Sequence, residues 1–171
     1  MIKYHQITDS KYDQQIRELY ELNNNQMGVH PVFTKGILDN ELSVPSNYYT
    51  ANGRYLIVAV EESQDRVVGL MCVSIIAPDS DAYEYLPDST CRFYELSNLS
   101  IHSDYRRQGI GTEMIRLARE KGAVHLSCLG TNSPALRFYD SLEFVSKSEE
   151  HRHSVRTNVD YTLVHYVFKM L

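Results

Sequence analysis

The sequence predicts an α/β protein in which a mixed, mostly antiparallel central sheet is flanked by helices. Short runs rich in Val, Ile and Tyr are separated by stretches with helical periodicity, which indicates strands and helices in one chain. Their order is strand, helix, three strands, helix, strand, helix and two strands. A chain of 171 residues has the length of one ordinary domain, so we expect a single domain over 1–171.

The first third of the chain contains one strand and one helix with clear patterns. Met1–Ile7 is expected to be a strand. Asp9-Ser10 is a helix N-cap, from which a helix should run to about Leu22. The next stretch, Asn23–Gly53, is rich in Asn, Pro and Tyr and is expected to be irregular, with at most a short helix at Thr34–Asn40.

A hairpin and a central strand follow. Arg54–Glu62 and Arg66–Ala77 are rich in Val and Ile and are separated by a short polar turn, which predicts paired strands. The loop Pro78–Thr90 carries four acidic residues and two tyrosines. Phe93–Ile101 is expected to be the central strand, and Gly109–Lys121 an amphipathic helix that follows it.

The last part of the chain should complete the sheet. Ser133 is expected to cap a helix that has Pro134 at its first position, because Pro lacks the N–H that this position leaves unpaired. The remaining strands are expected at Val124–Leu129, Glu143–Ser148 and Tyr161–Met170, the last two antiparallel and joined by a polar turn near Glu149–Asn158.

Composition narrows the classes of function. Seventeen basic residues against 22 acidic ones give a formal charge of −5, which argues against a nucleic-acid partner. No apolar run is long enough to span a membrane and the N-terminus lacks a signal-peptide core, so we expect a cytoplasmic protein without a membrane partner. Cys72, Cys91 and Cys128 lack metal-ligand spacing and are expected to be reduced, buried thiols. The pair His151 and His153 is expected in a solvated loop, so no metal is predicted.

One glycine-containing turn predicts a binding site for a diphosphate. Arg106-Arg107-Gln108-Gly109-Ile110-Gly111 lies between the central strand and the next helix, where unpaired backbone N–H groups and the helix dipole favour an anion. The two glycines let a phosphate approach the backbone, and the two arginines add positive charge. The spacing fits neither a P-loop, which needs Gly-Lys-Ser/Thr, nor a Rossmann turn, since Met114 stands where the third glycine belongs.

Two segments resemble signatures of a known family. Residues 96–111, a strand leading into Arg-x-x-Gly-x-Gly, resemble the acetyl-CoA-binding motif of the GCN5-related N-acetyltransferase (GNAT) family. Asn132–Phe144, an Asn followed by a helix with Phe-Tyr and then Glu-Phe, is similar to the family's second signature. The resemblance implies a GNAT-like acyl-CoA N-acyltransferase fold, with the sheet splayed between its fourth and fifth strands, and acetyl-CoA as the co-substrate.

The resemblance also implies where the coenzyme would bind. Its pyrophosphate would lie on the turn and helix start, and its pantetheine arm would run along the central strand. Asn132 would bond the pantetheine amides, and the Phe-Tyr pair would lie beside the sulfur. The implied cofactor-binding residues are Leu99, Ser100, Ile101, Arg106, Arg107, Gln108, Gly109, Ile110, Gly111, Thr112, Asn132, Phe138 and Tyr139.

Acetyl transfer to an amine needs a base for the amine and an acid for the departing thiolate. By resemblance, Tyr139 is the candidate general acid, because a phenol keeps its proton at neutral pH. Glu95, on the strand that would carry the donor, is the candidate general base, acting directly or through water. On pattern alone Glu95 could equally face solvent, and Ser97 and Asn98 could instead position a water.

The sequence therefore predicts an acetyl-CoA-dependent N-acetyltransferase that moves an acetyl group to a primary amine of a small molecule or peptide by direct attack. The alternative is a non-catalytic acyl-CoA-binding module that regulates a partner. The acceptor stays open, because the acidic loop Pro78–Thr90 would suit a cationic amine whereas Arg152, His153 and Arg156 would suit an acceptor with a carboxylate. A homodimer formed by exchange of the terminal strand Tyr161–Leu171 is a further option.

Overall fold

A seven-stranded sheet runs through the middle of the molecule. The computed structural model describes residues 1–29, 31–51, 53–77, 80, 86, 93–143, 146–155 and 158–168. The strand order is β1-β2-β3-β4-β5-β7-β6, in which only β4 and β5 run parallel. The predicted mixed, mostly antiparallel sheet is therefore confirmed. The strands are β1 (Ile2–Gln6), β2 (Tyr55–Glu61), β3 (Arg66–Ile75), β4 (Tyr94–Ile101), β5 (Ala123–Leu129), β6 (Ser146–Ser154) and β7 (Val159–Val167).

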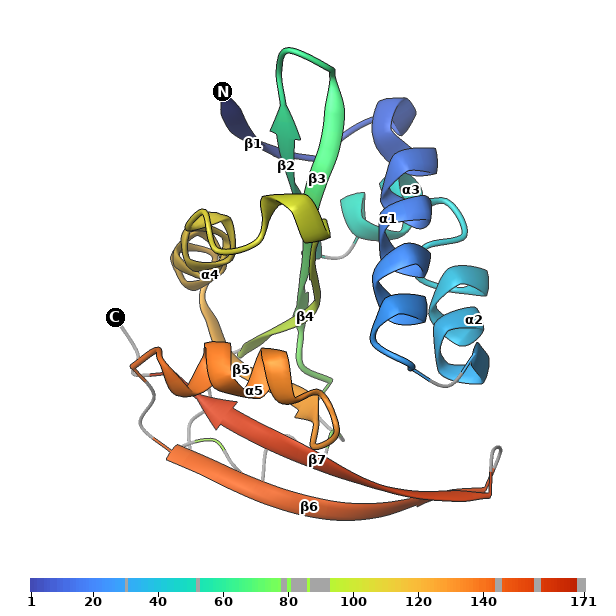
Figure 1. Ribbon diagram of the computed structural model, residues 1–171, viewed down its shortest axis with the longest axis vertical. Helices are drawn as coiled ribbons and strands as arrows, with labels where there is room; N and C mark the ends of the chain where they lie inside the picture. Colours follow the sequence, from blue (N-terminus) through green and yellow to red (C-terminus); the bar gives the residue numbers. More distant parts are fainter. Residues whose placement is uncertain are drawn as a thin grey trace.

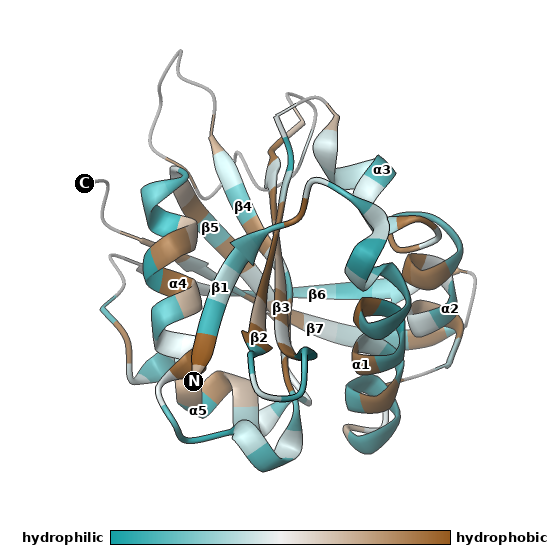
Figure 2. Cartoon of the chain, turned by 90° about the horizontal axis from the view of Figure 1, so that it is seen from above, coloured by the Kyte–Doolittle hydropathy of each residue, from teal (hydrophilic) through white to brown (hydrophobic). Residues whose placement is uncertain are grey.

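Helices cover both faces of this sheet (Figure 1). One face packs against α1 (Asp13–Gln26), α2 (Pro31–Asp39) and α3 (Pro45–Thr50), and the other against α4 (Ile110–Glu120) and α5 (Ser133–Asp140). Strands β2 and β3 are hydrophobic along most of their length (Figure 2) and buried on both faces, with successive residues pointing to opposite faces. Leu56 and Cys72 belong to the core under α1, whereas Ile57 and Leu96 belong to the core under α4.

The segment between the first helix and β2 is more regular than its composition predicts. Helix α1 continues four residues past Leu22 to Gln26, and Asn23–Gly53 contains two helices instead of one short one. Helix α3 depends on tertiary contacts, which cannot be recognised from the local sequence. Its Ser46 donates from its backbone N–H and its hydroxyl to the two oxygens of Asp13, at 2.9 and 2.7 Å.

The predicted turn at Glu149–Asn158 is wrong. Strand β6 continues through Ser154, with every residue from Ser146 to Ser154 paired to β7, so the first six residues of that stretch are strand. Its sequence is polar because β6 is the edge strand, which favours charged residues over apolar alternation. A cross-strand pair supports it, with His153 Nδ1 lying 2.7 Å from Asp160 Oδ1.

Strands β4 and β5 separate after three residue pairs, as the predicted splay requires. The parallel pairing covers only Tyr94 to Leu96, although β4 continues to Ile101. A bulge in β4 causes this divergence. Two residues of β4, Asn98 and Leu99, oppose one residue of β3, and Asn98 takes a left-handed conformation with φ of 54°. Beyond Leu96, no strand among the described residues pairs with the β5-facing edge of β4.

Gly69 on β3 lets α4 and β4 pack closely on the sheet, and its replacement tests this packing. A Cβ at Gly69 would lie 2.9 Å from Ile101 Cδ1, 3.1 Å from Met114 Sδ and 3.2 Å from Ala59 Cβ. We expect Gly69→Val to lower the free energy of unfolding by about 1–3 kcal/mol, because the core is overpacked. Urea denaturation measures the loss, and an unchanged midpoint would contradict the packing described.

None of the helices within the described ranges is long and apolar enough to cross a membrane. Cys72 and Cys128 are free and buried, as predicted, while Cys91 lies outside the described residues. Burial raises the pKa of Cys72 to about 12 and that of Cys128 to about 11. Both thiols are therefore expected to be unreactive in the folded protein.

Candidate active site

The predicted anion cradle lies at the N-terminus of α4. Gly109 is its N-cap, in a left-handed conformation with φ of 79°, and no atom lies within 4 Å of a Cβ built there. The surface above Gly109 is thus open, and the first N–H groups of the helix lack intrahelical partners. Gly111 is close to α5, because a Cβ at that position would lie 3.2 Å from Phe138 Cζ. The cradle and the Phe-Tyr helix are therefore adjacent.

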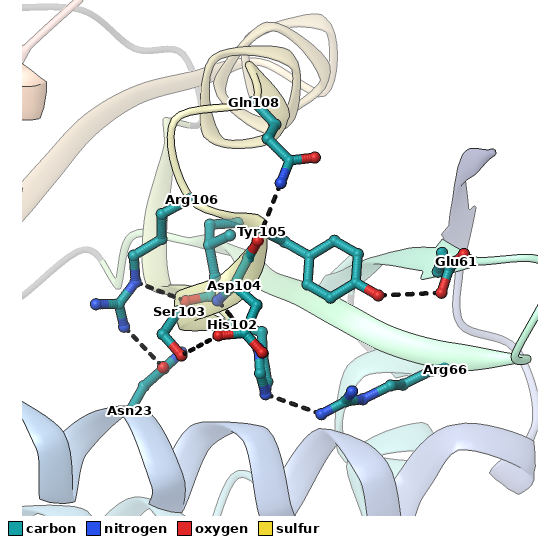
Figure 3. Close-up of polar contacts among 10 residues, drawn as sticks. Asn23, Glu61, Arg66, His102, Ser103, Asp104, Tyr105, Arg106 and Gln108 are labelled. Atoms are coloured by element: carbon teal, nitrogen blue, oxygen red, sulfur yellow. Dashed lines mark hydrogen bonds and ion pairs between the residues drawn. The ribbon is translucent and has the colours of Figure 1, made fainter.

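The loop before α4 is held by a network of polar contacts (Figure 3). Arg106 donates from Nε to the carbonyl oxygen of Ile101 at 3.0 Å and from a terminal nitrogen to Asn23 Oδ1 at 2.9 Å. Gln108 donates from Nε2 to the carbonyl oxygen of Asp104 at 3.0 Å. Arg106 and Gln108 thus fix the shape of the loop, and Arg106 ties it to α1.

His102 and Tyr105 complete this network on the side of the hairpin. His102 accepts a bond from the N–H of Asp104 at 3.3 Å, and its Nε2 lies 2.8 Å from a guanidinium nitrogen of Arg66. Burial and the Arg66 charge lower the pKa of His102, which keeps it neutral at pH 7. The Tyr105 hydroxyl donates to Glu61 at 3.0 Å. These contacts therefore hold the short helix Ser103–Tyr105, which leads into α4, against the β2–β3 hairpin.

Arg107 differs from its neighbour, since its side chain is exposed and its backbone is left-handed with φ of 60°. The Arg107 side chain makes no hydrogen bond or ion pair with the residues that the structure describes. Its charge is therefore available to a phosphate at the cradle. Thr112 is exposed in the first turn of α4, and Ile110 is buried in the core below.

The part of β4 predicted to carry the pantetheine arm lies at the opening between β4 and β5. Leu99 and Ile101 pack against the core under α4, and Ser100 is buried. Because the side chains of these three residues pack inside the protein, a ligand would bind to backbone groups at the unpaired edge of β4.

Helix α5 brings Asn132, Phe138 and Tyr139 to the same face as α4. Asn132 is the N-cap, accepting a bond from the N–H of Ala135 at 3.3 Å, so the predicted cap at Ser133 is wrong by one residue. Tyr139 is buried, its ring 5.5 Å from that of Tyr166, and its hydroxyl makes no hydrogen bond within the described part of the chain. Burial raises the pKa of Tyr139, so the phenol stays protonated.

Glu95 lies on the opposite face of the sheet from Tyr139. It pairs with Ser74 on β3 and His125 on β5, and its neighbour Leu96 points into the core under α4. Its side chain is 36% exposed, which makes it half-buried and not a fully solvated surface residue. Its Oε2 lies 3.7 Å from Nδ1 of His125. The candidate acid and base thus flank the opening between β4 and β5 from its two sides.

Sequence reasoning missed a second polar cluster under the bulge. Asn98 donates from Nδ2 to Glu41 Oε2 at 3.3 Å, and the Tyr49 hydroxyl donates to the same oxygen at 2.6 Å. Glu41 lies in the segment expected to be irregular, so no spacing signal links it to β4. Because the side-chain amide of Asn98 is bonded to Glu41, Asn98 is less suited to the predicted alternative role of positioning a water.

The regions predicted to select the acceptor are described only in part. Of the loop Pro78–Thr90 only Ser80 and Leu86 are described, and Arg156 and Phe144 also lie outside the described residues. Phe33 of α2 packs edge-on against Tyr161 of β7, with ring centroids 5.9 Å apart. An open hollow of about 330 Å³ adjoins this contact, lined by His151, Arg152, His153, Asp160, Tyr161 and Thr162.

Comparisons with known proteins agree with this architecture. Residues 52–146, more than half of the chain, match the family model described as "Acetyltransferase (GNAT) domain". A search of curated proteins finds no match. Among solved structures, Arabidopsis thaliana NAA60 in complex with a bisubstrate analogue is similar, with a TM-score of 0.67, 16% identity and 100% of both chains covered.

Two further structures show the same fold. NAA60 from Arabidopsis thaliana in complex with acetyl-CoA has a TM-score of 0.66 and 14% identity, covering 98% of each chain. A GNAT-family acetyltransferase from Staphylococcus aureus Mu50 has a TM-score of 0.64 and 14% identity, covering 99% of this chain and 100% of the other. The match to the family model, the splayed parallel pair and the glycine turn at α4 together lead to one conclusion: the chain belongs to the GNAT family of acetyl-CoA-dependent N-acetyltransferases.

Proposed function

We propose that this protein transfers the acetyl group of acetyl-CoA to a primary amine of a small molecule or peptide, by direct attack of the amine on the thioester. The observation that supports this most strongly is the opening between β4 and β5 beyond Leu96. The anion cradle of α4 lies on one face of the sheet at this opening, and Glu95 lies on the other. Donor and acceptor can therefore approach from opposite faces and meet in the gap.

The donor would be held mainly by backbone groups. The N–H groups from Gln108 to Thr112 would bind the pyrophosphate, with Arg107 supplying charge at the rim. The unpaired edge of β4 from Leu99 to Ile101 would bond the pantetheine amides in place of a strand. Phe138, packed against Gly111, and the amide group of Asn132 would complete the walls of this site.

The chemistry requires one proton to leave the nitrogen and one to reach the sulfur. A backbone N–H near Leu99 or Ser100 would polarise the thioester carbonyl during attack. Glu95 would take the proton of the attacking amine, directly or through water. Tyr139, kept protonated by burial, would donate its phenolic proton to the departing thiolate. Solvent would then restore both groups for the next turnover.

Tyr139→Phe tests the role of the acid. We expect kcat to fall by roughly 10- to 100-fold, with KM for acetyl-CoA nearly unchanged, because only the proton donor is lost. Tyr166→Phe is a matched control, since its ring packs against Tyr139 and its hydroxyl bonds Asp140 at 2.9 Å. The control should lose stability and keep kcat. Steady-state kinetics measure both, and equal kcat values for the two variants would contradict the assignment.

The proposed function is tested by incubating the protein with acetyl-CoA and a panel of amines while released thiol is detected. The panel should contain polyamines, aminoglycosides, amino acids and peptides, because the acceptor loops favour no single class. The raised pKa values of Cys72 and Cys128 keep these thiols from interfering, and a blank without amine corrects for Cys91. Amine-dependent thiol release supports the enzyme. Binding of acetyl-CoA without release by any amine would favour the non-catalytic module instead.

A further inference from the structure

A row of four titratable side chains crosses the sheet from the opening to its edge. Glu95 on β4 is followed by His125 on β5, His165 on β7 and Glu150 on β6, all on the face of the sheet opposite α4. Nε2 of His125 lies 3.1 Å from Nδ1 of His165, and Nε2 of His165 lies 3.0 Å from Oε2 of Glu150. The two imidazole side chains are only 2% and 4% exposed.

The hydrogen-bond partners determine which nitrogen of each ring carries the proton. Glu150 is a carboxylate, so His165 donates to it from Nε2 and its Nδ1 is an acceptor. His125 must then donate to that acceptor from Nε2. This leaves Nδ1 of His125 without a proton, buried, and without a hydrogen-bond partner among the described residues. That nitrogen lies 3.7 Å from Glu95, slightly beyond bonding distance.

We propose that His125 and His165 form a proton relay that carries the proton of the acceptor amine from Glu95 to Glu150; the proposal rests on the function proposed above. The protonated Glu95 gives its proton to Nδ1 of His125. The proton on Nε2 of His125 then moves to Nδ1 of His165, and the proton on Nε2 of His165 moves to Glu150. Each ring gains one proton and loses one, and Glu150 releases the proton to solvent.

The groups around the two histidines favour passing a proton along the row over keeping a histidine permanently charged. Burial lowers the pKa of His165, so its ring does not keep a second proton at neutral pH. Arg152 also faces this end of the row; it donates to Glu150 Oε1 at 2.6 Å and lowers the pKa of that carboxyl. Glu150 is 25% exposed and so reaches water. After product release, Glu150 takes up a proton from solvent and the same transfers run in reverse. This restores the starting tautomers, and the proton that arrives on Glu95 leaves to the water in the open site.

Glu150→Gln separates a relay from a structural role. A Gln side chain has nearly the same size and can accept the bond from His165, but it cannot take up a proton. We expect kcat to fall by about tenfold or more and the solvent isotope effect on kcat to rise, while KM for acetyl-CoA is unchanged. His165→Gln should show the same changes. The matched control is Glu149→Gln, the same substitution at the neighbouring position of β6, where the side chain is exposed and lies on the other face of the strand.

A second measurement does not depend on activity. Nitrogen-15 NMR of the histidines should find both His125 and His165 protonated on Nε2 and unprotonated on Nδ1 at pH 7. The opposite tautomer at either ring, or kcat values of Glu150→Gln and His165→Gln within twofold of the wild type, would overturn the relay. If the wild type acetylates an amine and the two variants do so equally well, the relay alone is wrong; if the wild type acetylates none, the proposed function fails too.

Discussion

Replacing Glu95 by Gln should lower kcat/KM for the amine by roughly 10²–10⁴-fold at neutral pH, the range expected when a general base is lost. Glu95 is a half-buried carboxylate on the face of the opening from which we propose that the acceptor approaches. The loss should shrink as the pH approaches the pKa of the amine, about 10 for an alkylamine, because the amine then needs less help to lose its proton. Initial rates measured between pH 6 and about 10 give this profile.

A control variant for Glu95 should lie on the same face and strand region but away from the opening. Ser74→Ala fits, since Ser74 is paired with Glu95 on β3 and carries no ionisable group. The control should keep both kcat/KM and its pH dependence. A Glu95→Gln enzyme with an unchanged pH–rate profile would remove Glu95 from the mechanism.

Gly109→Glu is expected to raise Kd for coenzyme A by roughly two powers of ten or more. A side chain at φ of 79° costs about 1–2 kcal/mol of strain, and a carboxylate placed beside a diphosphate adds like-charge repulsion of several kcal/mol. No atom lies within 4 Å of the added Cβ, so the variant should still fold. Isothermal titration calorimetry measures the change.

Gly28→Glu is the matched control for Gly109→Glu. Gly28 follows α1, has φ of 66° and likewise has no atom within 4 Å of an added Cβ. The same charge and the same strain are thus introduced away from the cradle. Its Kd for coenzyme A should equal that of the wild type. Equal losses at both glycines would mean that strain, and not the cradle, is responsible.

The sequence alone predicts the elements that local chemistry determines. The glycine turn at Gly109, the helix that follows it and the Val-rich hairpin were all expected where they occur. Each of these carries a local signal, such as a left-handed glycine or a run of β-branched residues. The splay between β4 and β5 followed from the family resemblance instead, because its cause, the bulge at Asn98, has no distinctive sequence pattern.

Features that depend on distant partners could not be predicted. Helix α3 relies on Asp13, more than thirty residues earlier, and β6 is a strand because β7 pairs with it. The row from Glu95 to Glu150 joins four strands, so only the sheet order brings its histidines together. The single domain, the cytoplasmic location, the absence of a metal and the strand-exchanged homodimer remain predictions.

The central claim is that the N-terminus of α4 binds the pyrophosphate of the coenzyme. Calorimetric titrations of the wild-type protein with coenzyme A and with pantetheine test it most directly, because pantetheine is the arm without the pyrophosphate and nucleotide. We predict saturable heat with coenzyme A and binding at least a hundredfold weaker with pantetheine. No heat with coenzyme A, or equal affinity for the two compounds, would contradict the claim.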